Sequence, residues 1–202
     1  MSPQHSKSQG KLFYVMGPSG SGKDSLLQYC REHNFDARTL QFAHRYITRA
    51  ATGAGENHIY LSPQEFKARK DAKLFALSWH SHGLDYGIGI EIDHWLQSGV
   101  SVVVNGSREY LPVASEQYSN IIPIEVTVSL DVLEQRLKAR GRESAEEISA
   151  RLERNHTLTM PMAMKVTIPS IVIHNNATLP EAGEAMLNAF KERLTAPCAF
   201  NF

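Results

Sequence analysis

Short runs of apolar and β-branched residues alternate along this chain with longer segments of helical periodicity. The runs fall at residues 11–16, 100–104, 122–128 and 171–173. Runs of this length, bounded by turn residues, are typical of buried strands, and apolar positions three to four residues apart are typical of helices. Regular alternation of the two predicts an α/β fold with a parallel central sheet flanked by helices.

Helix starts are marked by a hydroxyl residue three positions before a glutamate. Ser62, Ser144 and Thr178 stand in this position, which is the capping-box pattern, and we expect a helix to begin after each. Residues from about 42 to 86 fit the alternation poorly, because they combine polar turns, one helix and short strands. We interpret them as a region inserted into the fold.

Length and composition limit the classes of protein to which the chain can belong. Its 202 residues, 42% of them apolar and 21% charged, predict one globular domain over 11–202 after a flexible tail over 1–10. Basic and acidic residues number 21 each, so no overall field would attract nucleic acid or an anionic membrane. Cys30 and Cys198 are too few for a disulfide framework. With no signal-peptide pattern and no long apolar run, we expect a cytoplasmic protein.

A glycine-rich segment after the first predicted strand carries the strongest chemical signal. It runs Gly17, Pro18, Ser19, Gly20, Ser21, Gly22, Lys23, Asp24, Ser25 and continues into a helical pattern. A strand, a loop of this form and a helix together make a P-loop, whose backbone N–H groups and helix N-terminus bind phosphates while the lysine reaches the terminal ones. The sequence therefore predicts a site for a nucleoside triphosphate.

One position departs from the usual P-loop pattern. Asp24 stands where serine or threonine normally offers a hydroxyl to Mg²⁺, and the strand that should end in an acidic magnesium ligand ends instead in Asn105. A carboxylate also ligates Mg²⁺. Our hypothesis is that Asp24 supplies the negative metal ligand that Asn105 cannot. The alternative is that Asp24 only stabilises the first turn of its helix.

The P-loop and four further motifs resemble the guanylate kinase family in order and spacing. The further motifs are Thr48-Arg49, Gly55-Glu56, residues 60–66 and Tyr86-Gly87. The resemblance implies a P-loop kinase with an acceptor-binding insertion at about 43–88, where Arg49 and Tyr86 hold the acceptor phosphate. It also implies an arginine-rich lid at about 138–155.

The positions that read guanine in that family differ here. Arg45, Leu77 and Ile88 replace two small polar residues and a glutamate. Leucine accepts no hydrogen bond from guanine, and an unpaired base edge costs roughly 1–3 kcal/mol per group. Arg45 adds a positive charge four residues from Arg49. The substitutions indicate an acceptor with a second phosphate and no base.

Those changes, together with the motifs at 45–49, 55–58, 79–88 and 103–108, resemble the ribose 1,5-bisphosphate phosphokinases of bacterial phosphonate utilisation. The resemblance implies ATP-dependent phosphorylation of the 1-phosphate of ribose 1,5-bisphosphate with Mg²⁺ as cofactor. The product is 5-phosphoribosyl 1-diphosphate (PRPP). An acceptor phosphate with a pKa near 6 is already an anion at neutral pH and needs no general base.

The resemblance to this family also implies roles for residues outside the motifs, above all for the lid arginines and Asn175. Lys23, Arg140 and Arg151 are the expected catalytic groups, and Arg136, Arg142 and Asn175 are further candidates for the ATP site. We assign His58, Asn105, Ser107 and Arg108 to the acceptor site, beside Arg45, Arg49 and Tyr86. Trp79 and Trp95 are interpreted as core residues. His80 and His82, two residues apart in a predicted strand, are assigned to acceptor lining or packing rather than to a metal.

Three other functions stay open from the sequence. A nucleoside monophosphate kinase could recognise its base through other residues, and a kinase-derived binding module could hold a partner protein without turnover, although such modules tend to lose the P-loop. A sugar kinase with a hydroxyl acceptor would need a carboxylate base, for which Asp85 and Asp93 are candidates. A homodimer is possible under each of these readings.

Overall fold

The computed structural model describes residues 9–33, 36, 38–50, 57–141, 144, 146, 148–149, 152–153 and 169–195. Five parallel strands form the central sheet in the order β2-β7-β1-β8-β9. They are β1 (Leu12–Met16), β2 (Leu40–Phe42), β7 (Ser101–Asn105), β8 (Ile121–Thr127) and β9 (Ile171–His174). The predicted parallel sheet is confirmed. β2, with only three residues, was not among the predicted runs.

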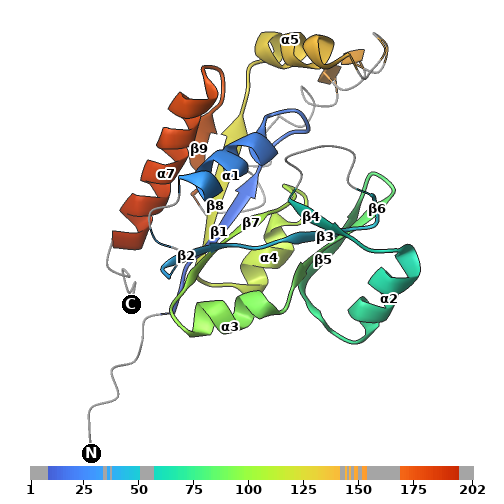
Figure 1. The fold of residues 1–202 in the computed structure, drawn as a ribbon, viewed down its shortest axis with the longest axis vertical. Coiled ribbons are helices and arrows are strands. Elements are labelled where there is room, and N and C mark those ends of the chain that lie inside the picture. The colour runs from blue at the N-terminus through green and yellow to red at the C-terminus, as the bar shows by residue number, and fades with distance from the viewer. Residues whose placement is uncertain are drawn as a thin grey trace, which may run out of the picture.

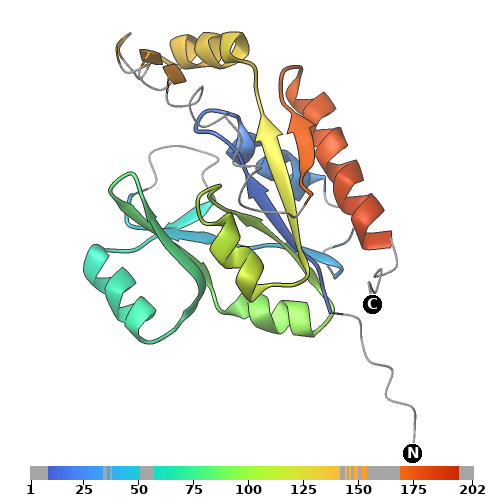
Figure 2. The ribbon, with the colours of Figure 1, turned by 180° about the vertical axis from the view of Figure 1, so that it is seen from behind.

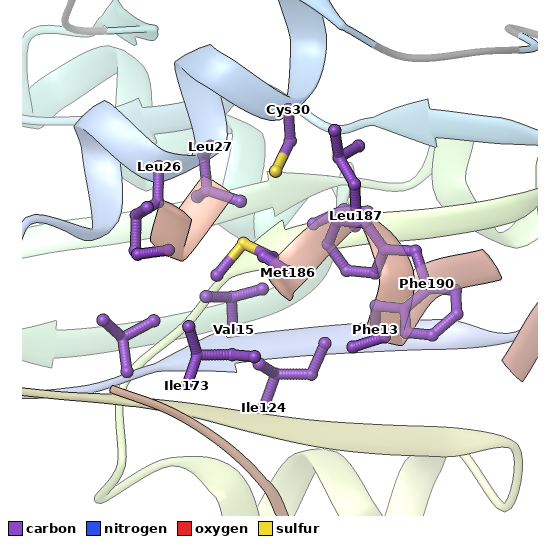
Figure 3. Packing of buried hydrophobic residues seen from close by; sticks show 14 of the residues in the cluster. Phe13, Val15, Leu26, Leu27, Cys30, Ile124, Ile173, Met186, Leu187 and Phe190 are labelled. Carbon is purple, nitrogen blue, oxygen red and sulfur yellow. The ribbon is translucent and has the colours of Figure 1, made fainter. Parts of the chain in front are cut away.

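Helices cover both faces of this sheet (Figure 1). Phe13 and Val15 of β1 pack in one core with residues of α1 (Lys23–Glu32) and α7 (Leu179–Thr195). Figure 3 shows this core, in which the Phe13 and Phe190 rings meet edge to face with centroids 5.0 Å apart. Leu12 and Tyr14 point to the opposite face and pack with α3 (Glu91–Gln97) and α4 (Leu111–Gln117). Strand alternation therefore divides the interior into two cores.

A second sheet contains β4-β3-β6-β5 in that order. Its members are β3 (Arg45–Ile47), β4 (His58–Tyr60), β5 (Phe75–Ser81) and β6 (Leu84–Gly89), with α2 (Pro63–Asp71) between β4 and β5. Apart from Gly89 at the end of β6, all of these elements come from the predicted insertion at about 43–88. Figures 1 and 2 show this sheet and α2 beside the central sheet, on the side of α3 and α4.

The predicted helix starts can be compared with the observed caps. The Ser62 hydroxyl accepts a hydrogen bond from the Glu65 backbone N–H at 3.1 Å, as expected for the start of α2. Thr178 and Glu181 form the reciprocal capping box of α7, because the Thr178 N–H donates to Glu181 Oε2 at 3.0 Å. The helix expected after Ser144 lies partly outside the described residues. Among the described helices, none combines the length and apolar character that crossing a bilayer requires.

Candidate functional site

The P-loop connects β1 to α1, at the carboxyl end of the central strand of the sheet (Figure 1). Gly20 and Gly22 adopt left-handed backbone conformations, with φ of 89° and 84°. A side chain at Gly20 would meet Leu133 Cδ1 at 2.6 Å, and one at Gly22 would meet Asn175 Nδ2 at 2.4 Å. Both positions therefore require glycine, for backbone conformation and for space.

Lys23 lies across the mouth of this loop. Its Nζ donates hydrogen bonds to the carbonyl oxygens of Gly17 at 2.7 Å and Pro18 at 3.1 Å. Burial lowers the pKa of Lys23 to about 8; Arg45 and Arg108 add to that effect, whereas Asp24 opposes it. Removal from water and nearby cations both disfavour the charged ammonium. An anion bound in the loop would favour that charge, as a phosphate does.

Asp24 joins the P-loop helix to the end of β7. Its Oδ1 accepts a hydrogen bond from Asn105 Nδ2 at 2.7 Å and lies 3.4 Å from Arg45 Nη2. The Asp24 side chain is 60% exposed, so its carboxylate can still reach a ligand in the cleft. Asn105 Oδ1 is buried and has no hydrogen-bond partner within the described part of the chain. The two residues of the magnesium hypothesis are thus direct neighbours.

A cleft of about 510 Å³ lies between the P-loop, the second sheet and the loop that follows β7. It gathers cationic side chains from all three, namely Lys23, Arg45, Arg49 and Arg108. Tyr86 and Ser107, also expected at the site, line the same space. The structure thus brings predicted donor-site and acceptor-site residues to one cavity, and its positive charge suits a polyanionic ligand.

Tyr14 of β1 fixes the loop after β7 through two hydrogen bonds. The Tyr14 hydroxyl accepts from the Ser107 N–H at 3.0 Å and donates to the Ser107 carbonyl at 2.9 Å. Burial raises the pKa of this phenol, whose ring leaves no room for a side chain at Gly106. Arg108 Nη1, next along the loop, lies 3.8 Å from Glu125 Oε1. Tyr14 looked like a core strand residue in sequence, and nothing in the pattern marked its hydroxyl.

Several predicted site residues lie outside the lining of this cleft. Asn175 is buried beneath the P-loop, where its Nδ2 donates to the Ser21 carbonyl at 2.7 Å. Arg136 of α5 (Leu130–Arg140) donates to the Ala177 carbonyl at 3.4 Å. His58 Nε2 lies 3.1 Å from the Arg49 carbonyl. Asn175 and His58 therefore contact backbone carbonyls of segments that line the cleft, at the P-loop and at Arg49.

The predicted lid at about 138–155 lies only partly within the residues that the structure describes. Arg142 and Arg151 are not among the described residues, and of Arg140 only the backbone is described, at the end of α5. The Gly55-Glu56 motif also lies outside them. Their assigned roles stay predictions.

Sequence reasoning missed other lining residues. Trp79 packs against the core on α3 and α4 as expected, but it also lines the cleft, as do Ile47, Ser81, His82 and Leu84. His82 does not continue the strand of His80 as expected: β5 ends at Ser81, and His82 has a left-handed φ of 51° in the β5–β6 turn. His80 instead contacts Asp85 Oδ1 at 2.9 Å. Only the turn signal of Gly83 could have indicated this break.

Leu77 and Ile88, which align with guanine-reading positions, lie on the same face of the second sheet as Trp79 and Tyr86 but outside the lining of the cleft. They are opposite each other on β5 and β6 and are 1% and 0% exposed, inside the core that packs on α3 and α4. Neither lines the cavity. These two positions therefore contribute packing and offer no group to a nucleobase.

No family model matches the chain, but curated relatives do. It is 49% identical over 193 residues to the ribose 1,5-bisphosphate phosphokinase PhnN of Thiobacillus denitrificans, covering 96% of this chain and 99% of that protein. The enzyme of the same name from Desulfomicrobium baculatum is 50% identical over 183 residues, covering 90% and 95%. Guanylate kinase from Anaplasma phagocytophilum superposes with a TM-score of 0.66 at 17% identity, covering 95% and 90%, which establishes the guanylate kinase-like fold. The chain belongs to the ribose 1,5-bisphosphate phosphokinase family.

Proposed function

We propose that this protein transfers the γ-phosphoryl group of ATP to the 1-phosphate of ribose 1,5-bisphosphate, giving PRPP and ADP. The observation that carries the proposal is the 49% and 50% identity, over 96% and 90% of this chain, to two kinases of that name. The cleft supports it, because a P-loop faces the arginines of β3 and of the loop after β7 across one cavity. Two polyanions brought together there need compensating positive charge.

The reaction forms a bond between an oxygen of the 1-phosphate and the γ-phosphorus of ATP, and breaks the bond from that phosphorus to the bridging oxygen, which leaves on ADP. Because the acceptor oxygen is already anionic near neutral pH, no proton has to be removed. The chain's work is to position the two substrates and stabilise charge on the transferring group. We assign this stabilisation to Lys23 first, with Arg45 and Arg108 beside it. Arg49 and Tyr86 hold the acceptor.

The donor set around Asp24 fits a magnesium ion carried in with ATP. Mg²⁺ prefers oxygen ligands, and in kinases it usually takes one or two carboxylates together with phosphate oxygens and water. The Asp24 carboxylate is accessible, and the buried carbonyl oxygen of Asn105 beside it has no hydrogen-bond partner among the described residues. When bound, the ion would neutralise charge on the donor phosphates. Asp24 is the residue that would hold it.

The test is product analysis of the purified protein with ATP, Mg²⁺ and a panel of acceptors. Phosphorus NMR should show the diphosphate signals of PRPP from ribose 1,5-bisphosphate, and little product from GMP, AMP or UMP. Preferential phosphorylation of GMP would identify a nucleoside monophosphate kinase and refute the proposal. Absence of turnover with every acceptor, in protein that still binds ATP, would favour a binding module and refute it as well.

We expect the Tyr14→Phe variant to raise the KM for the acceptor by about fivefold to tenfold, a factor worth roughly 1–1.4 kcal/mol. The hydroxyl is the group that holds Ser107, so its loss loosens the loop that carries Arg108 into the cleft. The KM for ATP should stay within twofold. Steady-state kinetics with each substrate varied in turn measure the split.

Tyr118→Phe is the matched control for this variant. The Tyr118 hydroxyl is also partly buried and donates to Asp93 Oδ1 at 2.6 Å, but neither residue lines the cleft. It should lower the melting temperature without changing either KM. If both variants raised the acceptor KM equally, the positioning role of Tyr14 would be wrong.

A further inference from the structure

A column of stacked side chains forms part of the cleft wall on the second sheet. Trp79 of β5 and Tyr86 of β6 are paired across the strands, with ring centroids 5.5 Å apart and planes only 6° from parallel. Trp79 also stacks on Tyr110, which precedes α4, at 5.5 Å and 27°. The guanidinium of Arg45 lies over the Tyr86 ring at 5.7 Å. The column therefore links β3, β5 and β6 to the loop after β7.

This column gives the cleft an apolar wall. Trp79 is half-buried and lines the cavity together with Ile47 and Leu84, whereas most of the remaining lining consists of polar groups, cations and P-loop backbone. Sites for small ligands combine an apolar surface with a few placed polar groups. In a pentose bisphosphate the phosphates take the polar groups, which leaves the C–H edges of the sugar ring for an apolar wall.

We propose that Trp79 determines the acceptor specificity of this enzyme. Its indole packs against the furanose ring of the acceptor and, held in place by Tyr86 and Tyr110, fills space that a nucleobase would need. This inference rests on the proposed function, because it takes a sugar bisphosphate as the acceptor. The enzyme then rejects nucleobases for two reasons: the Trp79 indole occupies the space that a base would need, and Leu77 offers no hydrogen-bond acceptor.

The first experiment uses single-tryptophan variants, since the chain has two tryptophans. Trp95→Phe leaves Trp79 as the emitter, and Trp79→Phe leaves Trp95, which is half-buried on α3 and does not line the cleft. Titration with ribose 1,5-bisphosphate should change the emission of the Trp95→Phe protein and leave that of the Trp79→Phe protein unchanged. An equal change in both, or a change only in the latter, would overturn the proposal.

The second experiment measures how Trp79 affects the KM for each substrate and the choice between acceptors. Trp79→Ala should raise the KM for ribose 1,5-bisphosphate by about tenfold or more, the range in which a hydrophobic pocket discriminates between ligands. The KM for ATP and the activity of Trp95→Phe should stay within twofold of the native values. The ratio of kcat/KM for GMP to that for ribose 1,5-bisphosphate should rise. Trp79→Leu, which keeps an apolar side chain, should fall between Trp79→Ala and the native protein.

Two outcomes would contradict the inference in different ways. If the native enzyme uses ribose 1,5-bisphosphate and Trp79→Ala has an unchanged KM and an unchanged acceptor ratio, Trp79 does not determine specificity while the proposed function stands. If the native enzyme instead prefers a nucleoside monophosphate, the proposed function and the inference both fail. The acceptor panel with native protein therefore comes first.

Discussion

Replacing Lys23 with methionine is expected to lower kcat/KM for ATP by about a thousandfold, the upper range for removing one charged or hydrogen-bonding group from a transition-state site. Methionine keeps most of the side-chain length but cannot donate to a phosphate. In the structure Nζ already lies at the mouth of the P-loop, hydrogen-bonded to the Gly17 and Pro18 carbonyls. A bound triphosphate offers the ammonium stronger, anionic acceptors than these carbonyls. Steady-state kinetics with the acceptor saturating measure the loss.

Lys138→Met provides the matched control. Lys138 is an exposed lysine on α5 whose Nζ lies 2.7 Å from Glu134 Oε1, so the variant removes one positive charge without touching the cleft. Its kcat/KM should stay within twofold of the native value. A Lys23→Met enzyme that keeps more than a tenth of the native kcat/KM would show that the arginines of the cleft suffice.

The parallel sheet and its order of helices could be predicted from the sequence because their signals are local. The run 102–104 is three valines, as expected of a strand buried on both faces, and the caps Ser62 and Thr178 mark helix starts with side-chain chemistry. β2 was not predicted, because its local signal is too short. Its three residues read Leu-Gln-Phe, too short a run to separate a strand from a turn.

The second sheet could be recognised only as a departure from the pattern. Its strands β3 and β4 have three residues each, and β3 pairs with β6 across some forty positions of chain. Such pairing is a non-local property that periodicity does not encode. The placement of Trp79 depends on it, because one face of the second sheet passes from the core at Leu77 to the cleft at Trp79, and nothing local to β5 marks where that change falls.

The P-loop was the opposite case, since its conformation, its lysine and its helix follow from one continuous segment. The contacts that support the P-loop and its cleft could not be predicted in this way. The hydrogen bond from Asn175 to the Ser21 carbonyl joins segments 154 positions apart, and the one from Tyr14 to the Ser107 carbonyl joins segments 93 positions apart. Nothing in either segment alone specifies the other, so these supporting contacts came only from the structure.

The contact between Asp24 and Asn105 leads to the second large effect. If the carboxylate of the magnesium site has moved from the end of β7 to the P-loop helix, exchanging the two residues should restore the usual arrangement. Asp24→Ser alone is expected to lower kcat/KM by about a hundredfold and to raise the Mg²⁺ concentration for half-maximal activity. Asn105→Asp alone should also impair turnover. It places a second carboxylate where Asn105 Nδ2 now lies 2.7 Å from Asp24 Oδ1, so two negative charges repel each other.

The double variant Asp24→Ser/Asn105→Asp carries one carboxylate at the end of β7 and one hydroxyl after Lys23, as P-loop kinases usually do. It should recover at least tenfold of the activity that Asp24→Ser loses, a coupling of about 1.4 kcal/mol in a double-mutant cycle. The Mg²⁺ concentration for half-maximal activity should return toward the native value. Losses that simply add, with no change in Mg²⁺ dependence, would leave Asp24 as an ordinary first-turn carboxylate whose partner is Arg45. Recovery would instead show that the metal requires one carboxylate oxygen between α1 and β7, and that either element can supply it.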